Sequence, residues 1–314
     1  MILLVTNKRD ITTDFIVLEL QRRALSYMRL NSEDIAGGSV RFSPAGGWTI
    51  DIGDRSVNLG DVRAGYYRRP GTPLPSAGGD GATEDYLATE WAAVLRSIWN
   101  ALDGRWLNSP FAILRAEDKP RQLWEARRLG FDVPETLVSN DFDAAAAFTA
   151  SGGMIGKPLR HALIERGETG EVLFTSRVGP LSEADREAVT LAPVIYQREI
   201  RKTHDIRATV IGDRVFAAAI HSQTCDETEV DWRRGGRVDL DHQAIDLPPE
   251  IAARCIALTK GLDLRYGAVD LICDEAGRYW FLEINPNGQW AWIERRTGLP
   301  LAAALVDELS CIAA

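Results

Sequence analysis

The sequence predicts a mixed α/β fold, in which an N-terminal α/β unit is followed by a part built from antiparallel strands. Two observations support this fold class. An apolar strand at residues 2–5 precedes a helical pattern at 12–23, which is the order found in α/β units. Later in the chain, apolar runs are joined by short turns at 212–213 and 274–277, which is typical of antiparallel hairpins.

Composition limits the classes of function. The 314 residues are 45% hydrophobic and 26% charged, as in a globular protein with two or three subdomains. The net charge of -9 argues against nucleic acid or an anionic membrane as the main partner. Residues 1–5 are too short for a signal peptide, and no apolar run approaches the ~18 residues that predict a transmembrane helix.

The cysteines predict a reducing compartment. Cys225, Cys255, Cys273 and Cys311 lie far apart and lack CxxC spacing. We interpret them as reduced core thiols of a cytoplasmic protein, not as a disulfide frame or a zinc site. The chain has no internal repeats and no GxGxxG, Walker A or GxSxG pattern, which disfavours dinucleotide-binding, P-loop and serine-hydrolase functions.

The N-terminal elements follow from local patterns. After the strand at 2–5, the helix at 12–23 has Thr13 or Asp14 as candidate N-cap. A strand at 26–30 and a hairpin, with strands 40–42 and 48–52 around a turn at 44–47, come next. A strand at 62–67 ends in Arg68-Arg69-Pro70, where the arginines form either an anion site or a solvated strand end; physics alone favours the solvated end. Residues 71–81 predict a flexible loop, and 83–102 a helix whose tryptophans belong to the core.

The middle of the chain alternates short helices and strands. A helix opens at Asp118-Lys119-Pro120, with Pro in its first turn, and ends at Gly130. A strand at 133–138, a helix at 142–150 and strands at 154–159 and 192–197 follow. Lys157 ends an apolar run, and a lysine that enters a buried environment needs an anion such as a phosphate. The alternative is an exposed strand end.

The C-terminal part is dominated by hairpins. The segment at 205–220 turns at 212–213, and a strand-end ion pair of Asp205 with Arg207 or Lys202 is one interpretation of its charges. A basic loop at 231–236 is either an anion-binding loop or a solvated turn. Helices are predicted at 247–261 and 301–312.

The most informative stretch is the predicted hairpin at 266–289, YGAVDLICDEAGRYWFLEINPNGQ. Glu283 and Asn285 are two apart on one strand, so their side chains share a face. If Asp270 lies opposite them, two carboxylates and an amide oxygen form a ligand set that suits Mg²⁺. The alternative is the solvent face of an amphipathic strand, with Asp270 ending the first strand.

This hairpin, D…FLEINPNGQ, resembles the metal-binding hairpin of the ATP-grasp ligases, and DKPRQLWEARRLGFDVPET followed by GKPL resembles the first half of their fold. The resemblance implies a pre-ATP-grasp α/β domain at 1–116, a central subdomain at 117–196 and a C-terminal subdomain with an antiparallel sheet at 197–314. It also implies ATP and two Mg²⁺ ions held by Asp270, Glu283 and Asn285. Lys119 and Lys157 would contact the ATP phosphates.

The same resemblance implies further site residues. The hinge would contact adenine mainly through its backbone and is formed by Gln197, Arg198, Glu199 and Ile200. Arg198 departs from the acidic or aromatic residue that the family commonly has there. Asp205 would lie near the ribose, Arg207 would face the substrate or the transferred phosphate, and Arg233, favoured over Arg234, would cover the γ-phosphate. The phosphate-covering loop at 160–170 is poorer in glycine than in many relatives, so the ATP pocket is expected to close differently.

One branch of the family is most similar: the ATP-grasp ribosomal peptide maturases, which include the microviridin and other graspetide synthetases. They join Asp or Glu side chains of a precursor peptide to Ser, Thr or Lys side chains through acyl phosphates, which gives macrolactones or macrolactams. The resemblance implies a leader-binding site near the hairpin after Asp205, and it allows a homodimer. No dedicated general base is evident; on chemical grounds alone the candidates are His161, His204, His221 and His242.

Two other functions remain open at this point. One is a small-molecule carboxylate–amine ligase of the glutathione-synthase or RimK type. The other is an ATP-binding regulatory or scaffold protein without turnover, against which the complete Asp270, Glu283 and Asn285 set argues.

Overall fold

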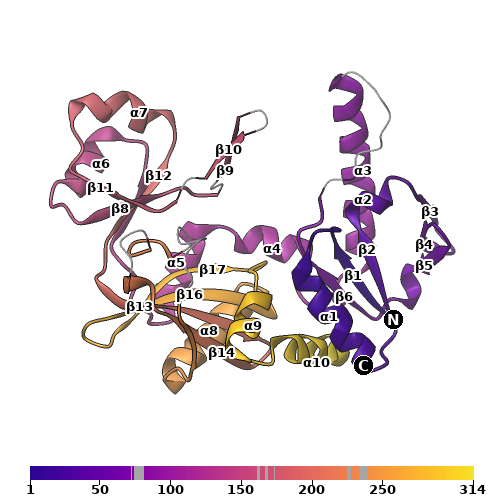
Figure 1. Ribbon diagram of the computed structural model, residues 1–314. Coiled ribbons are helices and arrows are strands. Elements are labelled where there is room, and N and C mark those ends of the chain that lie inside the picture. Colours follow the sequence, from indigo (N-terminus) through magenta and orange to yellow (C-terminus); the bar gives the residue numbers. More distant parts are fainter. Residues whose placement is uncertain are drawn as a thin grey trace.

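The computed structural model describes residues 1–71, 73, 81–160, 163–166, 169–172, 174–224, 228–232 and 240–314. It confirms the mixed α/β class (Figure 1). Three regions follow one another in the view: an N-terminal unit on the right, a small unit with α6 and α7 at the upper left, and a larger sheet between and below them. The predicted loop at 71–81 lies largely outside the described residues.

The N-terminal unit contains a parallel sheet in the order β2-β1-β6. Its strands are β1 (Ile2–Thr6), β2 (Tyr27–Asn31) and β6 (Ala64–Tyr67), and α1 (Ile11–Arg22) connects the first two. The predicted caps Thr13 and Asp14 were wrong. Asp10 caps the helix, since its carboxylate accepts from the Thr12 N–H at 3.2 Å.

A second, antiparallel sheet and a long helix complete this unit. The hairpin predicted between 40 and 52 is confirmed as β3 (Ser39–Ser43) and β4 (Gly47–Ile52), and β5 (Arg55–Asn58) adds a strand that the sequence did not predict. The short helix α2 (Ser32–Ile35) and the 3₁₀ turn η1 (Leu59–Asp61) lie on either side of this sheet in the chain. Helix α3 (Gly81–Ala101) buries only Ile98 and Trp99 fully, because its first turns project beyond the unit (Figure 1).

The middle region is an antiparallel sheet in the order β11-β8-β12-β7. Its strands are β7 (Thr136–Ser139), β8 (Met154–Lys157), β11 (Ser176–Val178) and β12 (Val194–Arg198). Helices α6 (Phe142–Thr149) and α7 (Arg186–Leu191) pack beside it, with η2 (Glu183–Asp185) before α7. The segment at 160–170 was predicted as a loop, but its described residues include β9 (Leu163–Arg166), which pairs in antiparallel fashion with β10 (Thr169–Val172).

The larger antiparallel sheet has the order β15-β14-β13-β16-β17. Both predicted hairpins belong to it. Its strands are β13 (Lys202–Ile211), β14 (Arg214–Ile220), β15 (His242–Ile245), β16 (Tyr266–Asp274) and β17 (Tyr279–Asn285), with η3 (Ser222–Thr224) after β14. The turn between β16 and β17 is fixed by Asp274, whose carboxylate accepts from Trp280 and Arg278 and from the Ala276 N–H. These bonds lower the pKa of Asp274 to about 2.

Helices cover both faces of this sheet. On one face, α4 (Pro110–Ala116), α5 (Lys119–Arg128) and α8 (Pro249–Gly261) contribute to a buried cluster around Val269 and Phe281. On the other face, α9 (Ala291–Thr297) and α10 (Leu301–Ala313) form a cluster that continues into β1, β6 and α1. The N-terminal unit and the larger sheet therefore share one hydrophobic core.

Two expectations from composition can be compared with the structure. Cys255 and Cys273 are buried, and burial raises the pKa of Cys255 to about 12, but Cys311 is exposed and is not a core thiol. Cys225 lies outside the described residues. In the part of the chain that the structure describes, no helix combines the length and apolar character needed to cross a membrane.

Candidate active site

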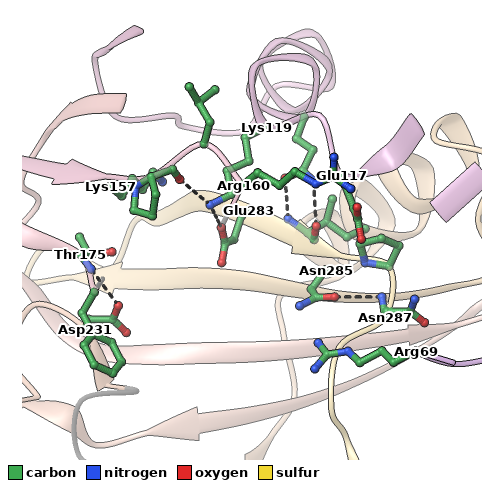
Figure 2. A pocket seen from close by; sticks show the side chains of 16 residues that line it. Arg69, Glu117, Lys119, Lys157, Arg160, Thr175, Asp231, Glu283, Asn285 and Asn287 are labelled. Carbon is green, nitrogen blue, oxygen red and sulfur yellow. Dashed lines mark hydrogen bonds and ion pairs between the residues drawn. The ribbon is translucent and has the colours of Figure 1, made fainter. Parts of the chain in front are cut away.

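Predicted site residues line two cavities, and one of them, of about 510 Å³, lies where the middle region, the larger sheet and the N-terminal unit meet (Figure 2). Lys119, Lys157, Glu283 and Asn285 all line it. A second cavity of about 60 Å³ shares Lys157, Glu283, Thr175 and Asp231 with the first, so the two are adjacent. Gln197, Asp205 and Asp270 line the smaller one.

The hairpin of β16 and β17 forms one wall. Its register places Asp270 directly opposite Glu283, as the sequence analysis required, and Asn285 opposite Ala268. A β-bulge follows Asp270, where Leu271 pairs with Phe281 so that Leu282 is the extra residue. Leu282 and Glu283 consequently both line the smaller cavity, although neighbours on a regular strand point to opposite faces.

Both hairpin carboxylates are paired with cations from neighbouring elements. The Arg207 Nε donates to Asp270 Oδ1 at 2.7 Å, and Lys119 Nζ lies 3.3 Å from Glu283 Oε2. The side chains of Asp270 and Glu283 are only 13% and 16% exposed, so the solvent-face interpretation of this strand is wrong. Among the described residues, no cluster of three or more His, Cys, Asp and Glu is arranged to hold a metal. The expected ligand set, however, contains only two carboxylates beside Asn285.

The two predicted lysines approach Glu283 from different elements. Lys119 begins α5 just after its N-cap, Asp118, and its Nζ also donates to the Pro158 carbonyl at 3.1 Å. Lys157 is the last residue of β8 and is 9% exposed, so it is not a surface strand end. Figure 2 shows Lys119 above Glu283, with Lys157 to the left of both.

Gln197 gives the smaller cavity an unused acceptor. Its side chain is fully buried, and its Nε2 donates to Thr136 Oγ1 at 2.8 Å. Thr136 in turn donates its hydroxyl proton to the Pro134 carbonyl, which fixes the orientation of the Gln197 amide. Gln197 Oε1 then has no hydrogen-bond partner among the described residues, which is costly for a buried oxygen.

The side chains of two other predicted hinge residues, Arg198 and Glu199, form ion pairs within the protein. Arg198 pairs with Glu135, and Glu199 forms a two-pronged pair with Arg177. The Arg198 and Glu199 N–H groups donate to the carbonyls of residues 135 and 153. Within the described chain, no such bond is formed by the Ile200 N–H.

Asp205 and Arg207 are both buried, and each is tied to another residue. Asp205 pairs with Lys202 at 2.8 Å and accepts from Ser222 at 2.5 Å, so the ion-pair interpretation applies to this residue. Burial raises the pKa of Asp205, against the opposing effect of Lys202. The Arg207 guanidinium lies over Trp232 and Trp292, at 5.6 and 6.0 Å from the ring centroids, and does not line either cavity among the described residues.

The two arginines after β6 have different surroundings. Arg68 is 2% exposed, so the solvated strand end is wrong for it. Its Nη1 donates to the carbonyls of Asn287 and Gly288, at 2.9 and 3.0 Å, and its Nε pairs with Asp10. The loop after β17 is thereby held by the N-terminal unit.

Two further side chains hold the same loop. Asn108 Nδ2 donates to the Pro286 carbonyl at 3.0 Å, and the Tyr266 hydroxyl donates to the Gly288 carbonyl at 2.7 Å. A Cβ on Gly288 would lie 2.4 Å from that of Ala268, so only glycine fits this close approach. These contacts therefore fix the loop that follows Asn285 and contains Asn287.

Several residues that line the large cavity were not predicted from the sequence. They are polar or charged and come from six separate segments: Arg69, Glu117, Arg160, Thr175, Asp231 and Asn287. Asn287 belongs to the predicted hairpin at 266–289, Asp231 to the basic loop at 231–236 and Arg69 to the arginine pair after the strand at 62–67, but Thr175 follows no recognisable signal. Arg233, Arg234 and His161 lie outside the described residues. No described histidine lines either cavity.

Comparison with protein families gives one match that covers most of this site. The model of the RimK-like ATP-grasp domain matches residues 116–309. A probable alpha-L-glutamate ligase of Pectobacterium carotovorum subsp. carotovorum (strain PC1) is 30% identical over 218 residues, or 68% of this chain and 69% of that protein. A probable alpha-L-glutamate ligase of Legionella pneumophila (strain Corby) is 29% identical over 258 residues, or 80% and 82%.

Solved structures extend the similarity to the N-terminal unit. The macrocyclase MdnC from Microcystis aeruginosa MRC, bound with precursor peptide MdnA, has a TM-score of 0.85 and 28% identity, and 99% of each chain is covered. A RiPP-associated ATP-grasp ligase of Chryseobacterium gregarium has the same fold, with a TM-score of 0.89, 24% identity and coverage of 99% and 96%. The ATP-grasp fold predicted from the sequence is confirmed.

Proposed function

Because the chain belongs to the RimK-like ATP-grasp family of ligases, we propose that it closes rings within a ribosomal precursor peptide. In this proposal, Asp or Glu side chains of the peptide are activated as acyl phosphates and joined to Ser or Thr hydroxyls or Lys amines. The observation that supports it best is the similarity to MdnC, which covers 99% of both chains and so includes the N-terminal unit.

The fold implies ATP and Mg²⁺ as cofactors, and the cavity residues fit both. The adenine would occupy the smaller cavity, because the orphaned Gln197 Oε1 there needs a donor such as an exocyclic amine. Of the hinge N–H groups, that of Ile200 is available for a ring nitrogen, whereas those of Arg198 and Glu199 are already donated. Asp205 lies in the same cavity, in a position that suits a ribose contact.

The phosphates would lie between the lysines and the hairpin. Lys119 and Lys157 supply positive charge at the junction of the two cavities, where both flank Glu283. Asp270, Glu283 and Asn285 offer hard oxygen ligands and would hold two Mg²⁺ ions, which neutralise phosphate charge. Arg207 pairs with Asp270 and would orient it, and Arg233, which follows Trp232 in the sequence, would cover the transferred phosphate.

The reaction then needs little covalent chemistry from the protein. A carboxylate oxygen of the substrate attacks the γ-phosphorus, and ADP leaves with the electrons of the broken phosphorus–oxygen bond. A hydroxyl or amine next attacks the acyl carbon, phosphate departs and the nucleophile loses its proton. The residues of the cavity contribute position and fixed positive charge, which stabilise the charge that develops.

The alternative is a ligase that adds glutamate or another small amine, as the names of the similar probable alpha-L-glutamate ligases suggest. Mass spectrometry separates the two functions when the protein is incubated with ATP, Mg²⁺ and a candidate precursor, that is, any short peptide encoded beside its gene that is rich in Thr or Ser and in Asp or Glu. Ring closure removes ~18 Da, one water, for each bond formed. A mass gain of one glutamate residue on adding free glutamate would favour the alternative, and an unmodified peptide without ATP turnover would indicate a scaffold.

A further inference from the structure

Arg69 enters the large cavity from the N-terminal unit in an unusual backbone conformation. Its φ is +44°, in the left-handed region that non-glycine residues rarely adopt, and Pro70 further restricts it. The Asn7 side chain donates to the Arg69 carbonyl at 2.8 Å, while Arg68 is locked beneath the cavity. Residues held in rare backbone conformations cluster at functional sites, because the surrounding structure must maintain them.

The order of residues across the two cavities places Arg69 at the far end from the adenine pocket. Gln197 and Leu271 line only the smaller cavity, and Lys157 and Glu283 line both. Asn287 and Arg69 line only the larger one. In Figure 2 Arg69 and Lys157 lie at opposite sides of the view, with Glu283 and Asn285 between them. A nucleotide that runs from the small cavity past Lys157 therefore directs its last phosphate toward Arg69.

The guanidinium of Arg69 is available for an anionic ligand. In the described part of the chain no ion pair or hydrogen bond is made by its side chain, although Glu117 lines the same end of the cavity. A guanidinium donates two parallel hydrogen bonds to a carboxylate, a geometry that lysine lacks.

We propose that Arg69 is a carboxylate-binding subsite, which holds the acid that is to be phosphorylated beside the end of the ATP phosphates. This inference rests on the proposed carboxylate activation, and it deepens it by assigning the acid to a residue outside the matched ATP-grasp segment. It predicts that the subsite selects a free carboxylate over an amide, whether the acid belongs to a peptide or to a small molecule.

Binding of glutarate to the protein loaded with Mg²⁺ and ADP tests this subsite, with glutaramide as the probe that lacks a carboxylate. Saturation-transfer NMR should detect glutarate at millimolar concentration and should not detect glutaramide. Arg69→Gly should weaken glutarate binding at least tenfold, since it removes the side chain but suits the positive φ. Arg69→Lys should bind with intermediate affinity, because it keeps the charge and loses the second donor.

Three controls make the outcome decisive. Arg63→Ala, an exposed arginine on the same segment, should bind glutarate as the unaltered protein does. The affinity for Mg²⁺–ADP should change less than about twofold in all variants, and the thermal midpoint of Arg69→Gly should be unchanged or raised. Equal binding of glutarate to Arg69→Gly, its absence from the unaltered protein, or a parallel loss of ADP affinity would overturn the subsite. If glutarate binding depends on Arg69 but the protein closes no ring in a peptide, the carboxylate subsite stands and only the proposed peptide substrate is excluded.

Discussion

The five-stranded sheet, which carries Glu283 and Asn285, packs apolar side chains on both of its faces, whereas the four-stranded sheet, which carries Lys157 and Gln197, rests on one small cluster. That cluster, in the described chain, consists of Phe142, Ala145, Val189 and Tyr196. The larger sheet instead shares a continuous core with the N-terminal unit through Trp290 and Leu305. The cavity therefore has one wall, the five-stranded sheet, that packs on an extensive core, and one wall, the four-stranded sheet, that packs on a small cluster. We call them the fixed wall and the thin wall.

From this difference we expect the five-stranded sheet to keep its position and the four-stranded sheet to move more easily. Local opening costs more where more apolar surface is buried, so the four-stranded sheet opens at a lower free energy. Contacts that join the two walls across the cavity include those of Lys119, which pairs with Glu283 and donates to the Pro158 carbonyl. The Thr175 N–H also donates to Asp231 at 3.3 Å. A nucleotide between the walls would add contacts to both and close them together.

The largest effect is expected for Arg68, which pairs with Asp10 and holds the loop after β17 of the fixed wall. Arg68→Ala leaves the Asp10 carboxylate buried without its partner and frees the carbonyls of Asn287 and Gly288. We expect the free energy of unfolding to fall by about 3–5 kcal/mol in urea titrations, as when one partner of a buried pair is removed. Arg63→Ala serves as the control. A loss below about 1 kcal/mol would mean that the loop is held without the N-terminal unit.

The next effect concerns chemistry on the fixed wall. Glu283→Gln removes an anionic oxygen ligand and should lower the ligation rate by about 10²–10³-fold, with weaker dependence on Mg²⁺. The rate and its Mg²⁺ titration measure this. Glu275→Gln, on the exposed turn of the same hairpin, should leave both unchanged. Full activity of Glu283→Gln would exclude its assignment as a metal ligand.

A smaller effect is expected on the thin wall. Lys157→Ala removes one charge-assisted contact to phosphate, worth about 1.5–3 kcal/mol, and should raise the KM for ATP by roughly 10–100-fold. The exposed Lys260 provides the control variant Lys260→Ala. An unchanged KM would show that Lys157 does not contact the nucleotide. The thin wall would then bind the nucleotide only through the hinge at 197–200.

The smallest effect is a pH dependence of the fixed wall. Burial would raise the pKa of Asp10, but Arg68, Thr13 and Thr6 together outweigh it and hold this pKa below the usual 3.8. A lowered folded-state pKa means that the ion pair stabilises the fold above pH 3.8 and that this contribution is lost as the pH falls through the folded-state value.

Asp10→Asn isolates that charge, because Asn also caps helices well. The variant should be less stable than the unaltered protein at pH 6 in urea titrations, and the difference should shrink as the pH falls below about 4. A difference that stays constant across this range would assign the stabilisation to hydrogen bonding and not to charge.

The sequence predicted the parts of the site that are local in the chain. The candidate metal ligands of the hairpin, the lysine that opens α5 and the strand that ends in Lys157 each have a pattern within about ten residues. The pairing of Asp270 with Glu283 does not follow from the turn at 274–277 alone. The register from that turn pairs Leu271 with Phe281 and would place Asp270 opposite Leu282, and only the bulge brings Glu283 opposite Asp270. Strand boundaries then differed by only one to three residues in most elements.

What the sequence did not predict depends on distant partners or on backbone detail. The burial of Arg68 requires Asp10 and the carbonyls of residues 287 and 288, which are far away in sequence. The bulge at Leu282 leaves the apolar pattern of the strand intact, so alternation alone does not reveal it. The positive φ of Arg69 has no signal in composition, and the division of the chain at residues 116 and 196 stays a prediction.

The Arg68 contacts also limit how this protein can be rearranged by recombination. A gene fusion at residue 116 would keep the entire matched family segment and still lose Arg68, Asp10 and Asn108, which support the loop at 286–288. A foreign N-terminal unit would restore the loop only if it supplied an equivalent guanidinium and amide. New specificities should therefore arise by point substitution around position 69 more readily than by exchange of whole N-terminal units.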